Sequence, residues 1–315
     1  MTSYSPPPQT QVSTNANFFV YALHFLWYNR FMMTTVAVEI NDFTKKYQNV
    51  TAVNNLNFSV AKGKIVGFVG KNGAGKSTTL RALFNLIKPT AGSMKVFGLD
   101  SQKNAKEIKR LASYVASEAS FYDNITCKQL LQFALFFTES SLEDVEDLAL
   151  YFELDLTKKI NTLSLGNRKK LSLIQGLIKK SQLLVLDEPT NGLDPLMQNK
   201  LFALLRKEQE NGTTILLSSH NLSEIEKYCD AVAIIKDGEL VDFFDMKDVK
   251  IKHKQILWLQ TKDGKTENYE IDEDINAVIA KLAKMDLAAV EIKTKTVEDE
   301  FIEYYRGDEK QHESN

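Results

Sequence analysis

A glycine-rich stretch at residues 70–78, GKNGAGKST, has the residue types and spacing of a phosphate-binding loop. It follows an apolar run at 65–69, which is typical of a buried strand, and precedes a helical pattern at 79–87. Glycines let the backbone turn sharply and direct successive N–H groups at phosphate oxygens, and the N-terminus of the next helix favours the same negative charge. We therefore expect a nucleoside triphosphate to be bound by Gly70, Lys71, Asn72, Gly73, Ala74, Gly75, Lys76, Ser77 and Thr78.

Two side chains of this loop and two carboxylates elsewhere could carry out hydrolysis. Lys76 is expected to reach the β- and γ-phosphates, and Ser77 to coordinate Mg²⁺. Asp187 and Glu188 directly follow another apolar run, at 183–186, and open α/β sheets bind ligands where their strands end. We expect Asp187 to hold Mg²⁺, directly or through water, and Glu188 to polarise the water that attacks the γ-phosphate.

A histidine, His220, ends a third apolar strand pattern that we expect to reach the same sheet edge. With these motifs in this order, residues 36–240 resemble the ATP-binding subunit of an ABC transporter. The resemblance implies an α/β fold, a P-loop NTPase cassette with a parallel core, an antiparallel β subdomain and an inserted helical subdomain. It also implies that His220 contacts the γ-phosphate and orients the attacking water, although a lone histidine here could simply cap or pack.

The sequence LSLGN at 163–167 resembles the signature loop of this family, which contacts the γ-phosphate held by the opposite subunit of a head-to-tail dimer. Leu165 stands where glycine is usual and Asn167 where glutamine is usual. Ser164 and Gly166 keep the hydroxyl and the close-approach glycine at a helix N-terminus. The alternative is that Ser164 is only a helix N-cap.

Three further residues take roles from the resemblance. Asp194, in GLDP at 192–195, matches the D-loop that helps to close the dimer, although a turn before a helix describes it equally well. Tyr47 matches the aromatic residue that stacks on adenine, with an unliganded edge-strand tyrosine as the alternative. Glu118 replaces the family's glutamine that senses Mg²⁺ and the γ-phosphate, and a carboxylate can bind Mg²⁺ through water but cannot donate a hydrogen bond.

The chain of 315 residues is 43% hydrophobic and 25% charged, with a formal net charge of −2, as in an ordinary soluble globule. This charge gives no reason to expect a nucleic-acid partner, and the basic runs at 103–110 and 168–170 are interpreted as solvated helix faces. Cys127 and Cys229 lack metal or disulfide spacing and are expected to be reduced thiols. The aromatic pair FY at 121–122 is either a contact for a membrane partner or part of the core.

The order of patterns predicts four segments after an N-terminal extension. Residues 1–32 are expected to be disordered or non-native, with translation starting at Met32 or Met33; the alternative is a membrane-surface anchor. No stretch approaches the roughly 18 apolar residues that span a bilayer. The predicted segments are a cassette at 33–240, its helical insert at about 103–180, a small α+β module at 241–305 and a flexible tail at 306–315.

The expected function is that of an ATPase that binds ATP and Mg²⁺, forms a homodimer or heterodimer, and drives a separately encoded transmembrane permease. It would lie in the cytoplasm on the inner face of the cell membrane. Because the C-terminal module resembles an accessory domain of drug, antibiotic or bacteriocin exporters, export is the expected direction. The alternatives are a soluble ABC-type ATPase of translation or DNA repair, and a slow or binding-only regulatory subunit.

Overall fold

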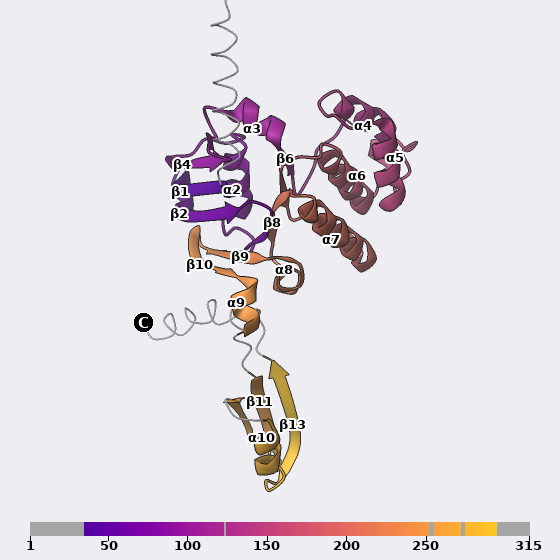
Figure 1. Cartoon of the computed structure of the whole chain (residues 1–315). Helices are drawn as coiled ribbons and strands as arrows, with labels where there is room; N and C mark the ends of the chain where they lie inside the picture. Colours follow the sequence, from indigo (N-terminus) through magenta and orange to yellow (C-terminus); the bar gives the residue numbers. More distant parts are fainter. Residues whose placement is uncertain (1–34, 123, 252–254, 272–274, 295–315) are drawn as a thin grey trace, which may run out of the picture.

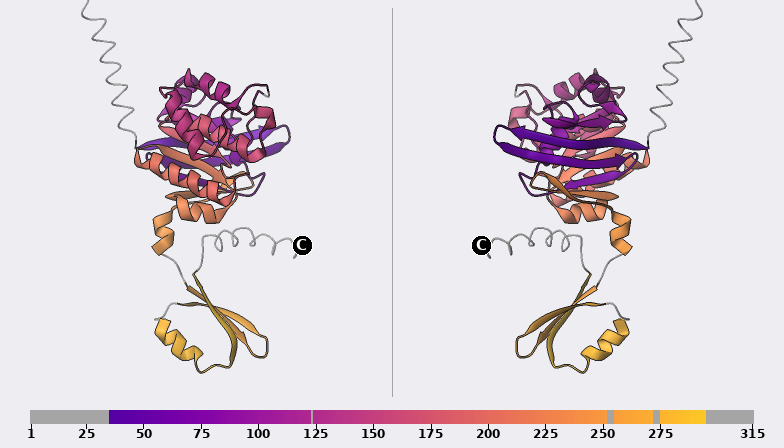
Figure 2. Two further views of the ribbon diagram at one scale, coloured as in Figure 1. Left: turned by 90° about the vertical axis from the view of Figure 1, so that its right-hand side faces the viewer. Right: turned by 90° about the vertical axis from the view of Figure 1, so that its left-hand side faces the viewer.

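The computed structural model describes residues 35–122, 124–251, 255–271 and 275–294. Within residues 35–251, an antiparallel sheet and a group of helices lie on opposite sides of a six-stranded sheet (Figures 1 and 2). The antiparallel sheet has the strand order β2-β1-β4-β5. Its strands are β1 (Val36–Tyr47), β2 (Val50–Ala61), β4 (Ala91–Val96) and β5 (Leu99–Asp100). The predicted antiparallel subdomain is thus present.

The six-stranded sheet has the order β10-β9-β3-β8-β7-β6, and all neighbours except β9 and β10 run parallel. Every residue of β3, β7 and β8 is buried, as their continuous apolar runs predict for strands covered on both faces. The C-terminal ends of these three strands therefore meet at one edge. The strands are β3 (Ile65–Val69), β6 (Ala112–Val115), β7 (Leu183–Asp187), β8 (Thr214–Ser219), β9 (Ala231–Lys236) and β10 (Glu239–Asp245).

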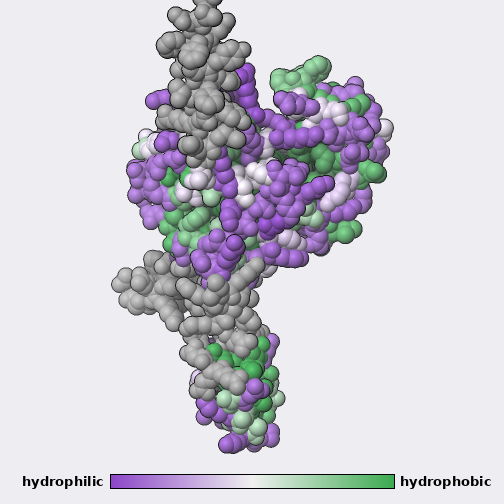
Figure 3. All heavy atoms as spheres, viewed as in Figure 1, coloured by the Kyte–Doolittle hydropathy of each residue, from purple (hydrophilic) through white to green (hydrophobic). Residues whose placement is uncertain are grey.

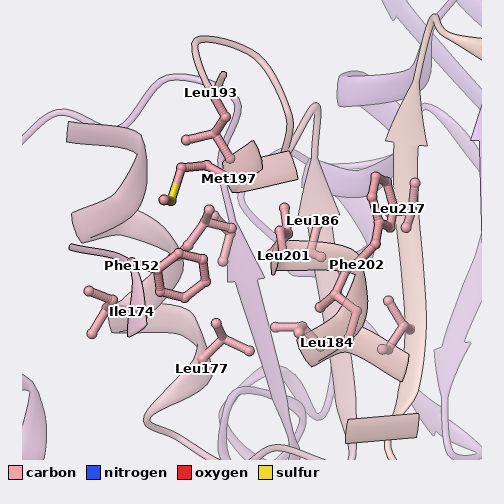
Figure 4. Close-up of a cluster of buried hydrophobic side chains, with 14 of the residues drawn as sticks. Phe152, Ile174, Leu177, Leu184, Leu186, Leu193, Met197, Leu201, Phe202 and Leu217 are labelled. Atoms are coloured by element: carbon pink, nitrogen blue, oxygen red, sulfur yellow. The ribbon is translucent and has the colours of Figure 1, made fainter. Parts of the chain in front are cut away.

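The two faces of this sheet are buried in two separate clusters, one formed mainly with helices and the other with the antiparallel sheet, α2 and α3. Alternate strand residues, such as Leu183 and Leu184, belong to different clusters because side chains of a strand point to opposite faces. One cluster joins the helices around α6 and α7 to β7 and β8 (Figure 4). The helices are α2 (Lys76–Leu83), α3 (Ala105–Leu111), α4 (Cys127–Leu135), α5 (Leu142–Tyr151), η1 (Ile160–Thr162), α6 (Leu165–Leu177), α7 (Pro195–Glu210), α8 (Leu222–Tyr228) and α9 (Met246–Ile251).

The C-terminal module contains its own antiparallel sheet, of order β12-β11-β13. Its elements are β11 (Gln255–Thr261), β12 (Thr266–Ile271), α10 (Ile275–Leu282) and β13 (Leu287–Thr294). Leu257 and Leu259 are buried, whereas Trp258 between them is half exposed, which is the alternation of a strand with one covered face.

Two predicted boundaries are wrong. The helical insert cannot begin at about residue 103, because β6 at 112–115 pairs with β7 inside the six-stranded sheet. The cassette does not end at residue 240, because β10 pairs with β9 as far as Asp245 and Met246 is buried in the same core. The helix predicted at 79–87 also ends earlier, at Leu83. The expectations for residues 1–32 and 306–315 lie outside the described residues.

The surface seen in Figure 3 is mostly hydrophilic over the cassette. Exposed apolar side chains gather around the C-terminal end of α4, where Phe133, Phe136 and Phe137 are all more than half exposed. Among the described residues, the helices are too short or too polar to cross a lipid bilayer.

Candidate nucleotide-binding site

The glycine-rich loop joins β3 to α2 and is fixed between the two sheets. Gly73 and Gly75 have φ of +87° and +105°, values that glycine adopts without strain. A Cβ on Gly70 would lie 2.4 Å from the carbonyl oxygen of Ile235, and one on Gly75 would lie 2.7 Å from that of Ala52. All three glycines are therefore required by the backbone itself, as a phosphate-binding loop demands.

Lys76 begins α2 and folds its side chain back over the loop. Its Nζ donates to the carbonyl oxygens of Gly70, at 2.5 Å, and Lys71, at 3.2 Å. The same Nζ lies 3.2 Å from Oε1 of Glu188, and both side chains are more than nine-tenths buried. Two of the residues that the sequence predicts to act at the γ-phosphate are thus ion-paired with each other.

Asp187, at the end of β7, is held by three hydroxyl groups. Its Oδ1 accepts hydrogen bonds from Ser77 Oγ at 3.0 Å and Ser218 Oγ at 2.7 Å, and its Oδ2 accepts one from Tyr114 at 3.2 Å. Burial, followed by the charge of Asp187, raises the pKa of Tyr114 to about 12, so the phenol stays protonated and donates. The structure therefore brings together Ser77 and Asp187, two of the three predicted Mg²⁺ ligands.

Glu188 has a strained backbone and a buried carboxylate. Its φ is +47°, and its N–H donates to Ser218 Oγ at 2.9 Å. Oε2 lies 2.9 Å from Nδ1 of the half-exposed His220. Oε1 has no hydrogen-bond donor within the described residues; the Lys76 ammonium compensates its charge without hydrogen-bond geometry. Glu188 and His220 therefore meet as predicted, with one carboxylate oxygen left unsatisfied.

A cavity of about 620 Å³ opens in front of this cluster, a size typical of small-molecule sites. The predicted Mg²⁺ and γ-phosphate sensor Glu118 lines it, whereas Tyr47 is not among its lining residues. Tyr47 lies at the end of β1 and is 45% exposed, with the Lys45 ammonium 4.8 Å from its ring centroid. The wall consists of Ala52, Asn72, Gly73, Gly75, Lys76, Ser77, Thr78, Ser117, Glu118, Ala119, Leu165, Arg168, Lys169, Ser172, Glu188 and Asn191.

The signature-like loop starts α6. Ser164 caps this helix by accepting a hydrogen bond from the N–H of Asn167 at 3.3 Å. A Cβ on Gly166 would lie 2.8 Å from the carbonyl oxygen of Gly192, so glycine is required for this close approach. Leu165, which replaces the usual glycine, is 72% exposed and causes no clash. Ser164, Gly166 and Asn167 are not among the residues that line the cavity of their own chain.

Asp194 caps α7 in the same manner, accepting from the N–H of Met197 at 3.0 Å. The turn-before-helix description of this motif is therefore confirmed.

In the aromatic pair at 121–122 the two residues differ: Phe121 packs against the core, and Tyr122 is 78% exposed. Cys127 and Cys229 are free and buried.

Lys169 contradicts the interpretation of 168–170 as a solvated helix face, because it is only 5% exposed. Its Nζ donates to the carbonyl oxygens of Ala116, Ser117 and Asp187 at 3.2–3.3 Å. Burial lowers the pKa of Lys169 to about 8, although nearby carboxylates favour the charged form. The spacing of the sequence could have predicted this burial. Lys169 precedes the buried Leu173 by four residues and therefore lies on the same face of the helix.

Ser218 and Tyr114 are the other residues that the sequence prediction missed. Both hold Asp187, yet each is a polar residue within a strand pattern, and nothing in such a pattern indicates which carboxylate it contacts. Only the parallel pairing of β6, β7 and β8 brings them to the end of β7.

Comparison with known proteins agrees with this geometry. The ABC transporter family matches residues 53–191. The bacitracin transport ATP-binding protein BcrA of Bacillus licheniformis is 36% identical over 236 residues, which cover 73% of this chain and 76% of that protein. An uncharacterised ABC transporter ATP-binding protein of Bacillus subtilis, YcbN, is 32% identical over 304 residues, with coverage of 87% and 98%.

Among solved structures, an ATP-binding subunit of an ABC transporter superposes with a TM-score of 0.63 at 26% identity, covering 69% of this chain and 92% of that one. These similarities favour a transporter subunit over a soluble ABC-type ATPase. The chain therefore belongs to the ATP-binding subunits of ABC transporters, which hydrolyse ATP to drive transport.

Proposed function

We propose that this chain hydrolyses ATP with Glu188 as the general base and that it energises a separately encoded transmembrane permease. The observation that carries the proposal is the buried Glu188 carboxylate, which contacts Lys76 with one oxygen and His220 with the other. Its unsatisfied Oε1 is an acceptor available to a water molecule. Such a base contributes when it lies within reach of the proton that it abstracts.

ATP would enter the cavity with its phosphates on the N–H groups of residues 70–78. Lys76 would then turn from Glu188 to the β- and γ-phosphates, which releases the carboxylate. A water oxygen would attack the γ-phosphorus in line, the bond to ADP would break, and the water proton would pass to Glu188. His220, through its contact with Glu188, would orient that water. We further propose that Tyr47 stacks on adenine.

The residues present also fit Mg²⁺. Ser77 lines the cavity, and its Oγ lies 3.0 Å from Oδ1 of the buried Asp187 behind it. Hydroxyl and carboxylate oxygens are the ligands that Mg²⁺ prefers beside substrate phosphates. These two residues would hold it, and Glu118 would contact it through water. Bound there, Mg²⁺ would neutralise charge on the phosphate oxygens.

A second copy of the chain, or a close relative, would complete each site. Ser164, Gly166 and Asn167 lie at the N-terminus of α6, where backbone N–H groups favour an anion, and they do not line their own cavity. We propose that they contact the γ-phosphate held by the partner subunit and that Asp194 lies at the same interface. Two ATP molecules would then join a head-to-tail dimer.

The transport direction that we propose is export, with the chain on the cytoplasmic face of the membrane through its permease. The support is the similarity to a bacitracin transport protein and the small C-terminal α+β module. The substrate class would be peptide antibiotics or related amphipathic compounds.

The test of the catalytic assignment compares Lys76→Ala and Glu188→Gln with the parent chain. Lys76→Ala should lose ATP binding, because the phosphates lose their only buried ammonium partner from the loop. Glu188→Gln should bind ATP but lose about 100-fold or more of its single-turnover hydrolysis rate, as expected for removal of a general base. Radiolabelled ATP in single-turnover mixtures measures the rate, and fluorescent nucleotide titration measures the binding.

Glu210→Gln is the matched control, because Glu210 is an exposed carboxylate at the end of α7. It should behave as the parent chain does. Parent-like hydrolysis by Glu188→Gln would show that Glu188 is not the base.

A further inference from the structure

Lys169 lies at the point where three parts of the site meet. It belongs to α6, and it donates to the last residue of β7 and to the segment that follows β6. We propose that Lys169 is a positioning residue of the ATPase, whose ammonium fixes the peptide group that carries Glu188 and links it to the segment that carries Glu118. This inference rests on the proposed role of Glu188 as the base.

The peptide group between Asp187 and Glu188 is held from both ends. Its carbonyl oxygen accepts a hydrogen bond from Lys169 Nζ at 3.3 Å, and its N–H donates to Ser218 Oγ at 2.9 Å. The following φ of +47° is costly for a residue with a Cβ, so the surrounding contacts must maintain it. The direction of the Glu188 side chain depends on this peptide, and therefore on Lys169.

The other two acceptors of Lys169 are the carbonyl oxygens of Ala116 and Ser117, which immediately precede Glu118. An ammonium group has three donors, and all three are directed at these carbonyls and at that of Asp187. The stem of Lys169 is anchored in α6, five residues after Ser164. A movement of α6 away from the sheet by more than the lysine stem can follow would break these bonds, so in this proposal Glu188 keeps its place while α6 and the Glu118 segment are docked.

The prediction separates catalysis from binding. Lys169→Met keeps the unbranched stem but removes the donors, so the hydrolysis rate should fall about tenfold or more, as for other residues that orient catalytic groups. The dissociation constant of ATP should change by less than about threefold: although Lys169 lines the cavity, its ammonium donates to three backbone carbonyls rather than to residues 70–78. A change that merely loosened the fold would alter both quantities.

The experiment measures single-turnover hydrolysis and ATP binding for the full chain, for Lys169→Met and for Lys169→Gln. Lys170→Met is the matched control on the next position of α6 and should behave as the parent chain does. Each variant is also made with Glu188→Gln. If Lys169 acts through Glu188, its replacement should cost less than about twofold in that background. The glutamine side chain of Lys169→Gln is too short to reach the three carbonyls. This variant should therefore show the same loss of hydrolysis rate, and it replaces Lys169→Met if that variant does not fold.

Two results would overturn the inference while leaving the proposed function intact. One is a folded Lys169 variant that hydrolyses ATP within twofold of the parent rate while Glu188→Gln remains slow. The other is a Lys169 substitution that costs the same factor with and without Glu188. Failure of the proposed function itself is distinct, because Glu188→Gln alone would then hydrolyse ATP at the parent rate.

Discussion

In our proposal, a γ-phosphate would replace the Glu188 carboxylate beside Lys76. The carboxylate and the ammonium are both buried, and each compensates the charge of the other. In our proposal, ATP would therefore exchange one anion for another at Lys76. The same exchange would release Glu188, so that binding would prepare the site for hydrolysis.

Glu224 is a second partly buried carboxylate close to the site, and it links two loops. Its Oε2 accepts hydrogen bonds from Thr190 at 3.1 Å and Ser219 at 3.4 Å. Burial raises the pKa of Glu224, and the hydrogen bonds from Thr190 and Ser219 oppose the rise without cancelling it. Relative to the unfolded chain, the folded chain therefore shifts Glu224 toward its protonated form.

Glu224→Gln should raise the melting temperature at pH 8. With a folded pKa above the unfolded value, the folded state binds more protons between the two, so this residue lowers stability as pH rises through that window. Glutamine mimics the neutral form, and its advantage should shrink as the pH approaches 4.5, the ordinary value for glutamate. Thermal unfolding at several pH values measures this, with the exposed Glu210→Gln as control. A gain independent of pH would contradict the argument.

At the level of elements, the N-terminus of α6 combines a structural role, the helix cap, with a proposed role in phosphate binding. Ser164 satisfies a backbone N–H of its own helix and, in our proposal, also faces the phosphate of a partner subunit. A substitution that preserves the helix cap but disturbs the phosphate contact can separate the two roles.

Ser164→Asp should do this. Aspartate caps helices as well as serine does, so the free energy of unfolding should stay within about 0.5 kcal/mol of the parent value, whereas Ser164→Ala should lose about 1 kcal/mol. The carboxylate would repel the γ-phosphate, so ATPase activity of Ser164→Asp should fall about tenfold or more. Urea unfolding and steady-state hydrolysis measure the two effects.

Thr126 offers the control, because it caps α4 by accepting a hydrogen bond from the N–H of Gln129 at 3.2 Å, away from the cavity lining, and its capping partner is neutral. Thr126→Asp should retain both stability and activity. If Ser164→Asp hydrolyses ATP as fast as Thr126→Asp does, Ser164 acts only as a cap.

The elements that the sequence predicted well are those with a single strong pattern. β3, β7 and β8 are buried on both faces, so a continuous apolar run was enough to identify them. β10 has half-buried residues on both faces and a mixed pattern, and its membership of the sheet depends on pairing with β9. Lys169 could not be assigned in the same way, because its burial depends on carbonyl groups more than 50 residues earlier in the chain.

At the level of the whole molecule, the cassette and the C-terminal module have separate sheets. Met246, in α9, is buried in the core of the cassette, and its N–H donates to the carbonyl oxygen of Asp230 at 2.8 Å. The cassette thus continues through β10 and α9, beyond the boundary at residue 240 that composition suggested.

A chain that ends after residue 251 should keep ATP binding and a melting temperature close to that of the full chain. A chain that ends after residue 240 should be strongly destabilised, since it loses most of β10 and the buried Met246. Circular dichroism melting and nucleotide titration compare the two. If both truncated chains were equally stable, the cassette would end at residue 240, as the composition suggested.

The glycine contacts of the phosphate loop have a consequence for how the protein acquires its activity. Gly70 rests on the carbonyl of Ile235 in β9, and Gly75 rests on that of Ala52 in β2. Gly238 joins the same contact, donating to Ala74 and accepting from Asn54. The loop therefore takes its shape only after strands from both sheets have docked. During synthesis, a growing chain should bind no ATP until residues 231–238 have left the ribosome. ATP binding should therefore stabilise only cassettes whose two sheets are already assembled.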